Sequence, residues 1–585
     1  MAGCPPRPAS DRPQDTGFTR QPMTQWLAPG QLAKTGLRVL LSGIFGTYAD
    51  KREYQEVRPA GHYDCSERSD LWFDFVSDIG DGFNPTYALA SILAEEKLDL
   101  AGPAGVGENH PTQRGSLLVM GGDEVYPTAD IDSYKNKTVG PYRAALPYTA
   151  SDHPRLFALP GNHDWYDGLT SFSRVFCQGN WIGGWQTSQR RSYFAAALPH
   201  RWWLWGIDIQ FDTYIDEPQL QFFRDEMGSL LQPGDSVILC SAMPNWVYAN
   251  EGRARAHAYD TLDFFQRTAI EPTGAVVRAN LTGDAHHYAR YQETAGDAQM
   301  FTAGGGGAFL SATHHLPEIL VLPPPDSPHT GTRSKVASLF DLKAAYPTKA
   351  ESKAIARGIV NLPRKNPTFV ALMSAVYLLF AWTIQSALVR PGQRLSDVMH
   401  SLSVTGVAAG IAHSPEAVVA IALLVLGMSG FTKTVPPKKY VLGSLHALAH
   451  LVAVVLLVRL VDQVLTGVSG LPYLAGYLVL VGAAGGLLGS LVMAGYLYVA
   501  GWYRCNDNEL FAAQRIEDWK NFLRLHIDTD GVLTVYPVKV DRVPKKWRLR
   551  QGGKIDDPWF EPDGTPPRPV LIEAPIRIRP ASDVA

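Results

Sequence analysis

The chain has 585 residues, which is enough for three or four structural units. Charged residues make up 19% of the chain and apolar residues 46%; an ordinary soluble domain has roughly 25% charged residues, so part of this chain must be poor in charge. The net charge of −3 argues against a nucleic-acid partner, and five scattered cysteines without a CxxC pair exclude a zinc ribbon or a dense disulfide scaffold and fit a reducing compartment.

Residues 1–35 are rich in Pro, Gly, Ser and charge and have no apolar periodicity. We therefore predict a disordered leader there, with no apolar segment of the signal-peptide type. The apolar run over residues 36–49 is too short to cross a bilayer, and we expect it to form a strand or a core helix.

Short apolar runs between Leu71 and Phe301 end abruptly in polar or glycine-rich loops. Examples are LWFDFVSD, SLLVMGGD, RLFALPGNHD, SVILCSAMP and VVRANLTGD. Helical stretches such as TYALASILAEEKLD lie between them. This alternation predicts α/β layers, with polar side chains at the strand ends. We expect a soluble α/β domain over residues 36–345 and a linker over 346–365.

Charge almost disappears after Lys365. Residues 366–389 are 24 positions without a charge, long enough to cross about 30 Å of hydrocarbon. Further apolar stretches follow at 417–431, 440–458 and 463–503. The last has 41 uncharged positions, which fits one long span with a re-entrant piece or two spans. We predict an all-α transmembrane bundle of about four spans over 366–503, and a polar C-terminal tail over 504–585.

Basic residues in the short loops favour one orientation of this bundle. One side carries Arg364, Lys365, Lys433, Lys438, Lys439 and Arg504, and the other carries Arg390, Arg394 and Arg459. This modest bias predicts that the soluble domain and the tail face the cytoplasm. Five spans instead of four would place the tail on the opposite side.

Four loops after apolar runs carry residue types that bind metals. They are SDIGDGFN with Asp78, GGDEVYP with Asp123 and Tyr126, GNHDWYDG with Asn162, His163 and Asp164, and GDAHHY with Asp284 and His286. Carboxylate, amide and imidazole groups suit Zn, Mn or Fe better than a calcium cage. We expect the four loops to converge on one edge of the sheet layer.

The order of these loops, GD, then GNHD, then a late His-rich loop, resembles the calcineurin-like metallophosphoesterases. GDEVY is similar to the GDxxY loop of purple acid phosphatases. The chain also resembles a membrane-anchored branch of plants and bacteria in the strings GTYADKRE, LPGNHDWYDGL, GGGGAFLSATHH and FLRLHID. The resemblance implies a β-sandwich flanked by helices as the catalytic domain. It further implies a membrane-anchored enzyme that hydrolyses a phosphate ester of a small molecule or a lipid.

The resemblance also implies a cofactor of one or two divalent or trivalent ions, Mn, Zn or Fe. Asp123 would bridge two ions, since a carboxylate has two oxygens. The other implied ligands are Asp78, His286 and Tyr126 at the first ion, and Asn162 and Asp284 at the second. A metal-bound hydroxide would attack phosphorus while His163 assists the leaving group. Asp164 would orient the His163 ring.

Three positions depart from the family pattern. Gly80 and Asp284 stand where the family usually has histidine, and Ala242 in SAMPNW replaces a further metal-binding histidine. Alanine cannot bind a metal, so we expect weak or conditional occupancy of the second ion. The alternative is a catalytically degraded membrane sensor or scaffold that binds a phosphorylated ligand.

Two other patterns need a separate interpretation. The run GGGGAFL lacks the Lys-Ser/Thr of a P-loop, so we expect it to pack its backbone closely beside the site. His446 and His450 are four residues apart and share a helix face. We expect polar contacts within the bundle, with metal or haem ligation as the alternative.

Overall fold

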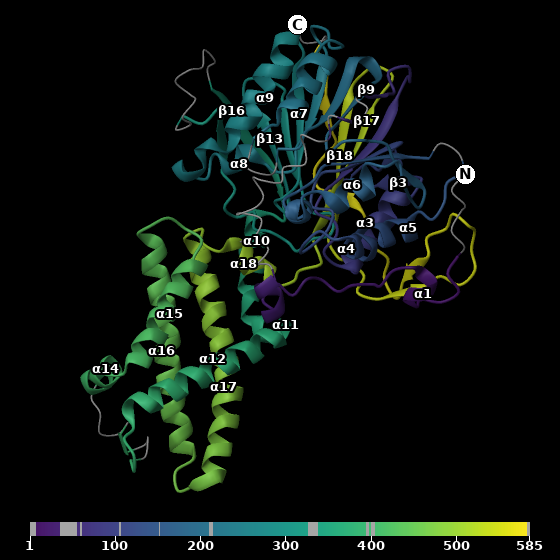
Figure 1. The fold of residues 1–585 in the computed structure, drawn as a ribbon. Helices are drawn as coiled ribbons and strands as arrows, with labels where there is room; N and C mark the ends of the chain where they lie inside the picture. The colour runs from purple at the N-terminus through teal and green to yellow at the C-terminus, as the bar shows by residue number, and fades with distance from the viewer. Residues whose placement is uncertain are drawn as a thin grey trace. The chain divides into compact units, whose positions relative to one another are not determined.

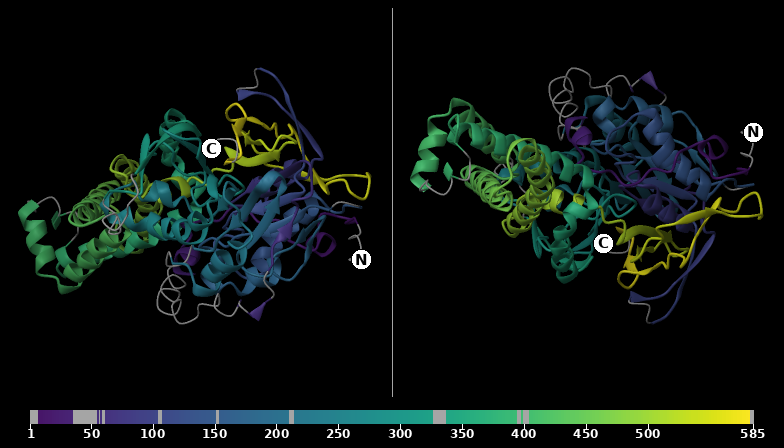
Figure 2. Two further views of the ribbon diagram at one scale, coloured as in Figure 1. Left: turned by 90° about the horizontal axis from the view of Figure 1, so that it is seen from above. Right: turned by 90° about the horizontal axis from the view of Figure 1, so that it is seen from below.

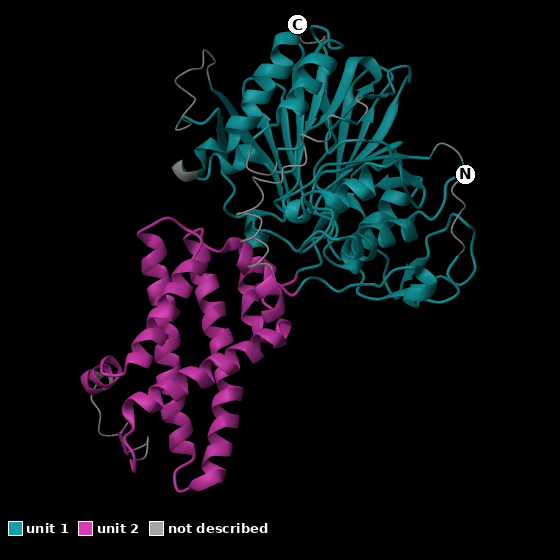
Figure 3. Ribbon diagram, viewed as in Figure 1, with its two compact units in different colours: residues 1–24, 35–352, 516–585 teal, residues 25–34, 353–515 magenta. Residues whose placement is uncertain are grey.

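The chain folds into two compact units in a computed structural model (Figure 3). The first unit comprises residues 1–24, 35–352 and 516–585, and the second comprises residues 25–34 and 353–515. The structure describes residues 7–34, 55, 57–58, 61–103, 107–150, 153–209, 214–325, 337–393, 397–398 and 404–581. The predictions for residues 36–49, for the string GTYADKRE and for Arg394 therefore fall outside the described residues.

Two mixed sheets form the centre of the first unit (Figure 1). The order of the first is β1 (Tyr63–Asp64), β9 (Phe194–Leu198), β10 (Trp202–Gly206), β11 (Ser236–Cys240), β12 (Val276–Thr282), β14 (Gln299–Ala303), β13 (Tyr288–Glu293), β16 (Ser338–Tyr346) and β15 (Ile319–Leu322). The order of the second is β21 (Val570–Leu571), β18 (Leu533–Val540), β17 (Lys520–Ile527), β2 (Leu71–Val76), β5 (Leu117–Met120), β6 (Arg155–Ala158), β8 (Trp185–Thr187) and β7 (Trp181–Ile182), and β22 (Ile576–Ile578) pairs with β18.

The sheets pack face to face because successive side chains point to opposite faces of a strand. Phe73 and Phe75 of β2 lie in one buried cluster with Leu204 and Ile238 of the other sheet. Val76, on the opposite face of β2, packs among the helices instead. The helices on this outer face are α3 (Phe83–Ala94), α5 (Gly140–Ala145) and α6 (Thr170–Phe176), and those on the other sheet are α7 (Glu217–Gln221) and α9 (Asp260–Phe265). The expected α/β sandwich flanked by helices is confirmed.

Parallel strand pairs determine where the polar loops lie. β2, β5 and β6 are parallel neighbours in one sheet, and β11 and β12 are parallel neighbours in the other. The carboxyl ends of parallel strands lie at the same edge. The loops with Asp78, Asp123, Asn162 and Asp284 all follow these strands, so the fold gathers them.

The first unit also contains several short elements, namely α1 (Pro13–Thr16), β3 (Lys97–Leu100), β4 (His110–Gln113), α4 (Ile131–Tyr134), α8 (Asn245–Tyr248), β19 (Trp547–Leu549) and β20 (Phe560–Pro562).

Residues 516–585 belong to the first unit, although sequence analysis placed them in a separate polar tail. β17 pairs antiparallel with β2, with Leu523 opposite Phe75, and β18 continues the sheet. Figure 2 shows these yellow C-terminal strands beside the early strands of the chain. Phe522 and Leu525 are fully buried. In NFLRLHID, apolar residues alternate with polar and charged ones, so the composition of this segment is that of a polar tail. Its pairing with β2 nevertheless makes it a core strand.

Part of the expected leader is also ordered. Phe18 is buried, and its ring centroid lies 6.1 Å from that of Phe83 and 6.3 Å from that of Phe560. Met23 is buried as well and touches the Gly82 backbone. A few apolar anchors therefore hold this Pro-rich segment on the domain, which its overall composition did not indicate.

The second unit is helical. Its main helices are α12 (Pro367–Leu388), α15 (Pro415–Phe431), α16 (Lys438–Val464) and α17 (Gly470–Trp502), and its shorter ones are α11 (Leu362–Lys365), α14 (Val404–Ala412) and α18 (Asp507–Ala512). Among the described residues, α12, α16 and α17 are long and apolar enough to cross a membrane, while α15 has 17 residues. The 33 residues of α17 form one continuous helix of about 50 Å at ~1.5 Å per residue. The long uncharged stretch is thus a single helix. The expected linker carries α10 (Lys349–Ala356) and α11.

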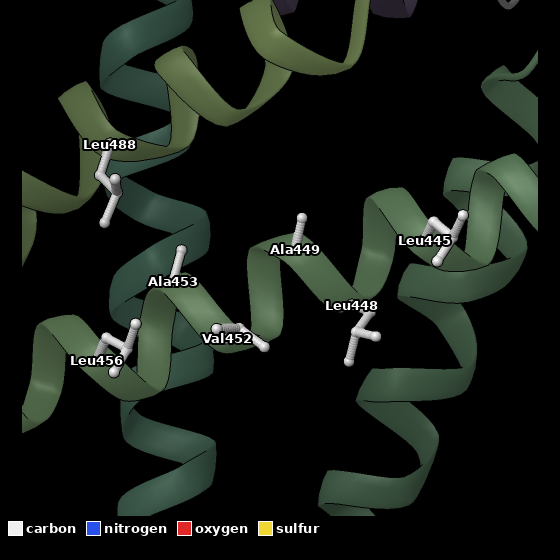
Figure 4. Close-up of a pocket in the computed structure, with 7 residues that line it drawn as sticks. All are labelled: Leu445, Leu448, Ala449, Val452, Ala453, Leu456 and Leu488. Carbon is white, nitrogen blue, oxygen red and sulfur yellow. The ribbon is translucent and has the colours of Figure 1, made fainter. Parts of the chain in front are cut away.

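Small residues and polar pairs hold the helices of the second unit together. A Cβ on Gly485 would lie 2.7 Å from the Tyr377 side chain, so glycine allows α17 to approach α12 closely. The Nε2 atoms of His446 and His450 lie 3.1 Å apart, and the Tyr377 hydroxyl lies 3.0 Å from Nδ1 of His450. These are the polar contacts expected within the bundle. Residues of α16 and one residue of α17 also line an apolar groove, namely Leu445, Leu448, Ala449, Val452, Ala453, Leu456 and Leu488 (Figure 4).

Candidate active site

Three carboxylates at strand ends share an unusual backbone conformation. Asp78 follows β2, Asp123 follows β5 and Asp284 follows β12, and their φ angles are 60°, 54° and 62°. Residues with a side chain seldom adopt this left-handed conformation, and such strain gathers at functional sites. The chain turns sharply at each strand end and thereby presents a carboxylate at the same edge of the sandwich.

The Tyr126 hydroxyl contacts side chains from the loops of both sheets. It donates a hydrogen bond to Asp78 Oδ1 at 2.9 Å or to Asp123 Oδ2 at 3.1 Å, and it lies 2.9 Å from His286 Nε2. His286 Nε2 also lies 3.5 Å from Asp78 Oδ1. All four residues are buried. The structure thus brings together the four residues that sequence analysis assigned to the first ion.

The residues assigned to the second ion lie in the loops beside this cluster. The Asp284 backbone N–H donates to Asp78 Oδ2 at 2.9 Å, which joins the two sheets. The Tyr248 hydroxyl donates to Asp284 Oδ2. The Asn162 side chain is hydrogen-bonded to the Tyr166 hydroxyl. Asp284 therefore borders the cluster directly, while Asn162 lies one residue before the His163 amide that contacts Asp123.

His163 and Asp164 have different partners from the expected ones. The His163 backbone N–H donates to Asp123 Oδ1 at 2.9 Å, and its ring Nδ1 lies 2.7 Å from the Pro127 carbonyl oxygen. The Asp164 carboxylate accepts hydrogen bonds from the Gly161 N–H at 2.8 Å and from the Tyr134 hydroxyl. The Pro127 carbonyl thus orients the ring, while Asp164 holds the loop that carries it.

Ala242 lies at the site, in the loop after β11. Its carbonyl oxygen accepts a hydrogen bond from the Gly283 N–H at 3.1 Å. A Cβ on Gly122 would lie 2.9 Å from the Ala242 Cβ, which places Ala242 beside the Asp123 loop. The position is the one where a further histidine was expected, and its methyl group offers no ligand.

Glycines let the loops approach one another. A Cβ on Gly283 would lie 1.8 Å from Ser77 Oγ, and one on Gly304 would lie 2.6 Å from Asp78 Oδ2. In the same run, a Cβ on Gly305 would lie 2.1 Å from Asn521 Nδ2 of β17. The close backbone packing expected for the glycine run is confirmed.

The charges of the cluster fit a cation. Burial raises the pKa of Asp78, and the negative charge of Asp284 raises it further. Burial and the neighbouring Asp78 and Asp164 likewise raise the pKa of Asp123. Burial lowers the pKa of His286, which favours the neutral ring that a metal requires. A positive ion between these groups would stabilise the ionised carboxylates.

The converging donor set is mixed in chemistry. In the described part of the chain, no group of three or more His, Cys, Asp or Glu side chains has by itself the arrangement to hold a metal ion. The set around Asp78, Asp123 and His286 includes the Tyr126 phenol at its centre. The residues therefore fit a site in which a phenol oxygen serves beside carboxylate and imidazole ligands.

Sequence reasoning missed several residues that support the site. Tyr134 of α4 and Tyr248 of α8 hold Asp164 and Asp284, and the Pro127 carbonyl holds His163. Tyrosines on helices outside the four loops carry no local signal of such contacts. Pro127 lies within the GGDEVYP string, but a backbone carbonyl has no sequence signature.

Residues 71–287 match the family model described as calcineurin-like phosphoesterase. Among solved structures, the chain is similar to the purple acid phosphatase PPD1 from yellow lupin (Lupinus luteus) seeds, at 11% identity over 43% of this chain and 46% of that chain, with a TM-score of 0.27. It is also similar to PhoD, at 12% identity over 43% of this chain and 59% of that chain, with a TM-score of 0.26. The chain thus covers about half the length of these structures. No curated protein matches the chain.

Proposed function

Residues 71–287 form a calcineurin-like phosphoesterase domain, and from this premise we propose that the chain is a membrane-anchored, metal-dependent phosphoesterase. The observation that carries the proposal is the meeting of Asp78, Asp123, Tyr126 and His286 around one hydroxyl. Asn162 and Asp284 complete the proposed ligand set at the edge of this cluster. The ions, when bound, would supply a Lewis acid that neutralises phosphate charge and activates water.

His163 is the proposed group at the leaving oxygen. A carbonyl oxygen can only accept, so the hydrogen bond to Pro127 places the ring proton on Nδ1 and leaves Nε2 available. Burial lowers the His163 pKa to about 4, so the ring is neutral before substrate binds, although part of the side chain reaches solvent. An anionic phosphate beside Nε2 favours its protonation, and that proton can then pass to the departing alkoxide.

The membrane region gives the enzyme its proposed location. Helices α12, α16 and α17 suit a bilayer by length and composition. The excess of Lys and Arg in the loops with Arg364, Lys365 and Lys433 supports a cytoplasmic catalytic domain. The proposed substrate is a phosphorylated small molecule or lipid.

Hydrolysis of p-nitrophenyl phosphate by the full-length protein in detergent, with Mn²⁺ or Zn²⁺, tests this function. We expect turnover by the wild type and a loss of about 10³-fold or more in kcat for Asp123→Asn, because the carboxylate lies at the centre of the transition-state charge. The control Asp225→Asn alters an exposed carboxylate and should keep wild-type activity. Equal turnover by the wild type and Asp123→Asn would refute the assignment.

One observation favours a second function. Ala242 lies beside the Asp123 loop but has no side-chain atom that binds a metal. A sensor that binds a phosphorylated molecule without hydrolysing it would tolerate this loss. Binding of inorganic phosphate with no turnover under Mn²⁺, Zn²⁺ or Fe would support the sensor over the enzyme.

A further inference from the structure

The N-terminal segment of residues 16–24 lies against the part of the first unit that carries the candidate ligands. It runs past the start of α3 and past the turn that follows α4 (Figure 1). The Phe83 N–H donates to the Gln21 carbonyl oxygen at 2.8 Å, and the Thr19 N–H donates to Asn136 Oδ1 at 2.7 Å. These bonds hold the segment at a fixed place beside the site.

Thr24, at the end of this segment, contacts two parts of the site. Its backbone N–H donates to Asp81 Oδ1 at 2.9 Å, and Asp81 belongs to the loop that begins with Asp78. Its hydroxyl accepts a hydrogen bond from Lys137 Nζ at 3.4 Å. Asp81 is fully buried and Lys137 is half-buried. Thr24 therefore joins the Asp78 loop to Lys137, which lies in the π-helical turn Lys135–Val139.

Lys137 Nζ binds the backbone of the residue whose phenol lies at the centre of the cluster. It donates to the Tyr126 carbonyl oxygen at 2.6 Å. The next carbonyl oxygen along the chain, that of Pro127, lies 2.7 Å from His163 Nδ1. Two successive carbonyl groups thus connect Lys137 with the Tyr126 phenol and with the ring that is proposed at the leaving oxygen.

An ammonium group suits this position. It has three N–H groups, so it can bind the Tyr126 carbonyl and the Thr24 hydroxyl at the same time. A hydrogen bond from a charged donor is also roughly twice as strong as one between neutral groups. Burial lowers the pKa of Lys137, and the negative charges of Asp81 and Asp130 oppose this lowering.

A movement of the Tyr126–Pro127 peptide would displace two candidate site groups together. The phenol contacts Asp78, and the Pro127 carbonyl orients the His163 ring. A misplacement of about 1 Å in a reacting group can cost a factor of about 100 in rate. The firmness with which Lys137 holds this peptide is therefore of direct importance for the chemistry.

We propose that Lys137, bound to Thr24 of the N-terminal segment, is a positioning residue that fixes the Tyr126–Pro127 peptide and thereby places the Tyr126 phenol and the His163 ring. The inference rests on the proposed function. It makes residues 16–24, which precede the matched residues 71–287, part of the structure that supports the site.

Two measurements on the full-length protein in detergent test this role, namely Mn²⁺ affinity by equilibrium dialysis and the kcat and KM for p-nitrophenyl phosphate. For Lys137→Met we expect about tenfold weaker Mn²⁺ binding and a kcat lower by about 10–100-fold. We expect KM to stay within about threefold of the wild-type value, because a positioning residue makes no contact with the substrate. Lys137→Arg keeps a charged donor and should recover most of both losses.

The control Lys135→Met removes an exposed lysine from the same turn and should match the wild type in all three quantities. Thr24→Val keeps the shape of the side chain but removes the hydroxyl that binds Lys137 Nζ, and we expect a kcat lower by about threefold to tenfold. If Lys137→Met does not fold, Thr24→Val decides the question, and a wild-type kcat in that variant overturns the inference.

Three results with folded Lys137→Met would overturn the inference. They are Mn²⁺ affinity and kcat equal to those of the wild type, losses that Lys137→Arg does not recover, and a higher KM at an unchanged kcat, which would make Lys137 a group that binds the substrate. A wild type that binds Mn²⁺ but does not hydrolyse p-nitrophenyl phosphate would overturn the proposed function alone, because the Mn²⁺ comparison still decides the role of Lys137.

Discussion

Arg524 and Asp74 form a bidentate ion pair inside the first unit, across the boundary between β17 and β2. Arg524 Nε lies 2.8 Å from Asp74 Oδ1, and Nη2 lies 3.2 Å from Oδ2. The side chains are 0% and 3% exposed. The pair joins a strand made before the apolar helices to one made after them.

Removal of one partner should destabilise the domain strongly. Arg524→Ala leaves the Asp74 carboxylate buried without its cation, and we expect a loss of about 3–5 kcal/mol in the free energy of unfolding. Chemical denaturation followed by tryptophan fluorescence measures it. Arg548→Ala breaks an exposed pair with Glu561 and should cost at most about 1 kcal/mol. A similar cost for both variants would contradict the importance of the buried pair.

Tyr126→Phe should weaken the proposed metal centre while it keeps the fold. The variant removes the hydroxyl that contacts Asp78, Asp123 and His286 and retains the ring, whose centroid lies 4.4 Å from that of His163. We expect metal affinity to fall by about 10–100-fold, measured by metal analysis after dialysis. Tyr142→Phe is a matched control, since its buried hydroxyl has no hydrogen-bond partner in the described structure. Unchanged metal content in Tyr126→Phe would remove the phenol from the ligand set.

Ala242→His should strengthen binding of a second ion. The methyl group lies beside the Asp123 loop, where an imidazole could reach the ion that Asn162 and Asp284 are proposed to hold. We expect at least about tenfold tighter binding of the second ion, seen as a higher metal-to-protein ratio. Ala242→Leu adds comparable bulk without a ligand and should leave the ratio at the wild-type value. Two tightly held ions in the wild type would contradict the expected weakness.

Lys520 should make stability depend on pH in the alkaline range. Burial lowers its pKa to about 8 from 10.5, opposed by the acidic Asp518, Asp81 and Glu517. Between these pH values the folded state has released a proton that the unfolded state still holds, so the free energy of unfolding rises with pH. Between these pH values, the free energy of unfolding of the wild type should rise by about 3 kcal/mol relative to that of Lys520→Met. The control Lys343→Met removes an exposed lysine, and its free energy of unfolding should follow that of the wild type at every pH. A stability difference between wild type and Lys520→Met that does not change with pH would contradict the assignment to Lys520.

His450→Leu should weaken the helical unit. The change leaves the Tyr377 hydroxyl and His446 Nε2, which belong to buried side chains, without their hydrogen-bond partner. We expect a loss of about 1–2 kcal/mol, seen as a lower thermal midpoint in detergent. His413→Leu alters an exposed histidine at the end of α14 and serves as the control. An equal midpoint in wild type and His450→Leu would show that the pair contributes nothing.

Local patterns were sufficient for much of the fold and for part of the site. Apolar runs that end in Asp or Asn gave the strand-end loops, and parallel strands then force Asp78, Asp123 and Asp284 to one edge. The long stretches without charged residues predicted the helices α12 and α17, because a helix needs a minimum apolar length to cross the hydrocarbon layer. These features depend on neighbours in sequence or on a general rule of topology.

Contacts between segments that are far apart in the chain could not be predicted from local sequence patterns. β17 pairs with β2 across some 450 positions, and neither strand alone specifies its partner. The anchoring of Phe18 against Phe560 and the support of Asp164 by Tyr134 are of the same kind. The orientation of the His163 ring depends on the Pro127 carbonyl, which every residue type would offer.

The place of β17 has a consequence for biosynthesis. Its partner β2 leaves the ribosome early, yet the sheet stays open at this edge until the last apolar helix has been made. Translation of the roughly 170 residues between β16 and β17 takes about 10–30 s at ~5–20 residues per second. Until β17 has been made, the edge of β2 that it covers has no strand partner, so the growing chain carries an unpaired strand edge during this interval.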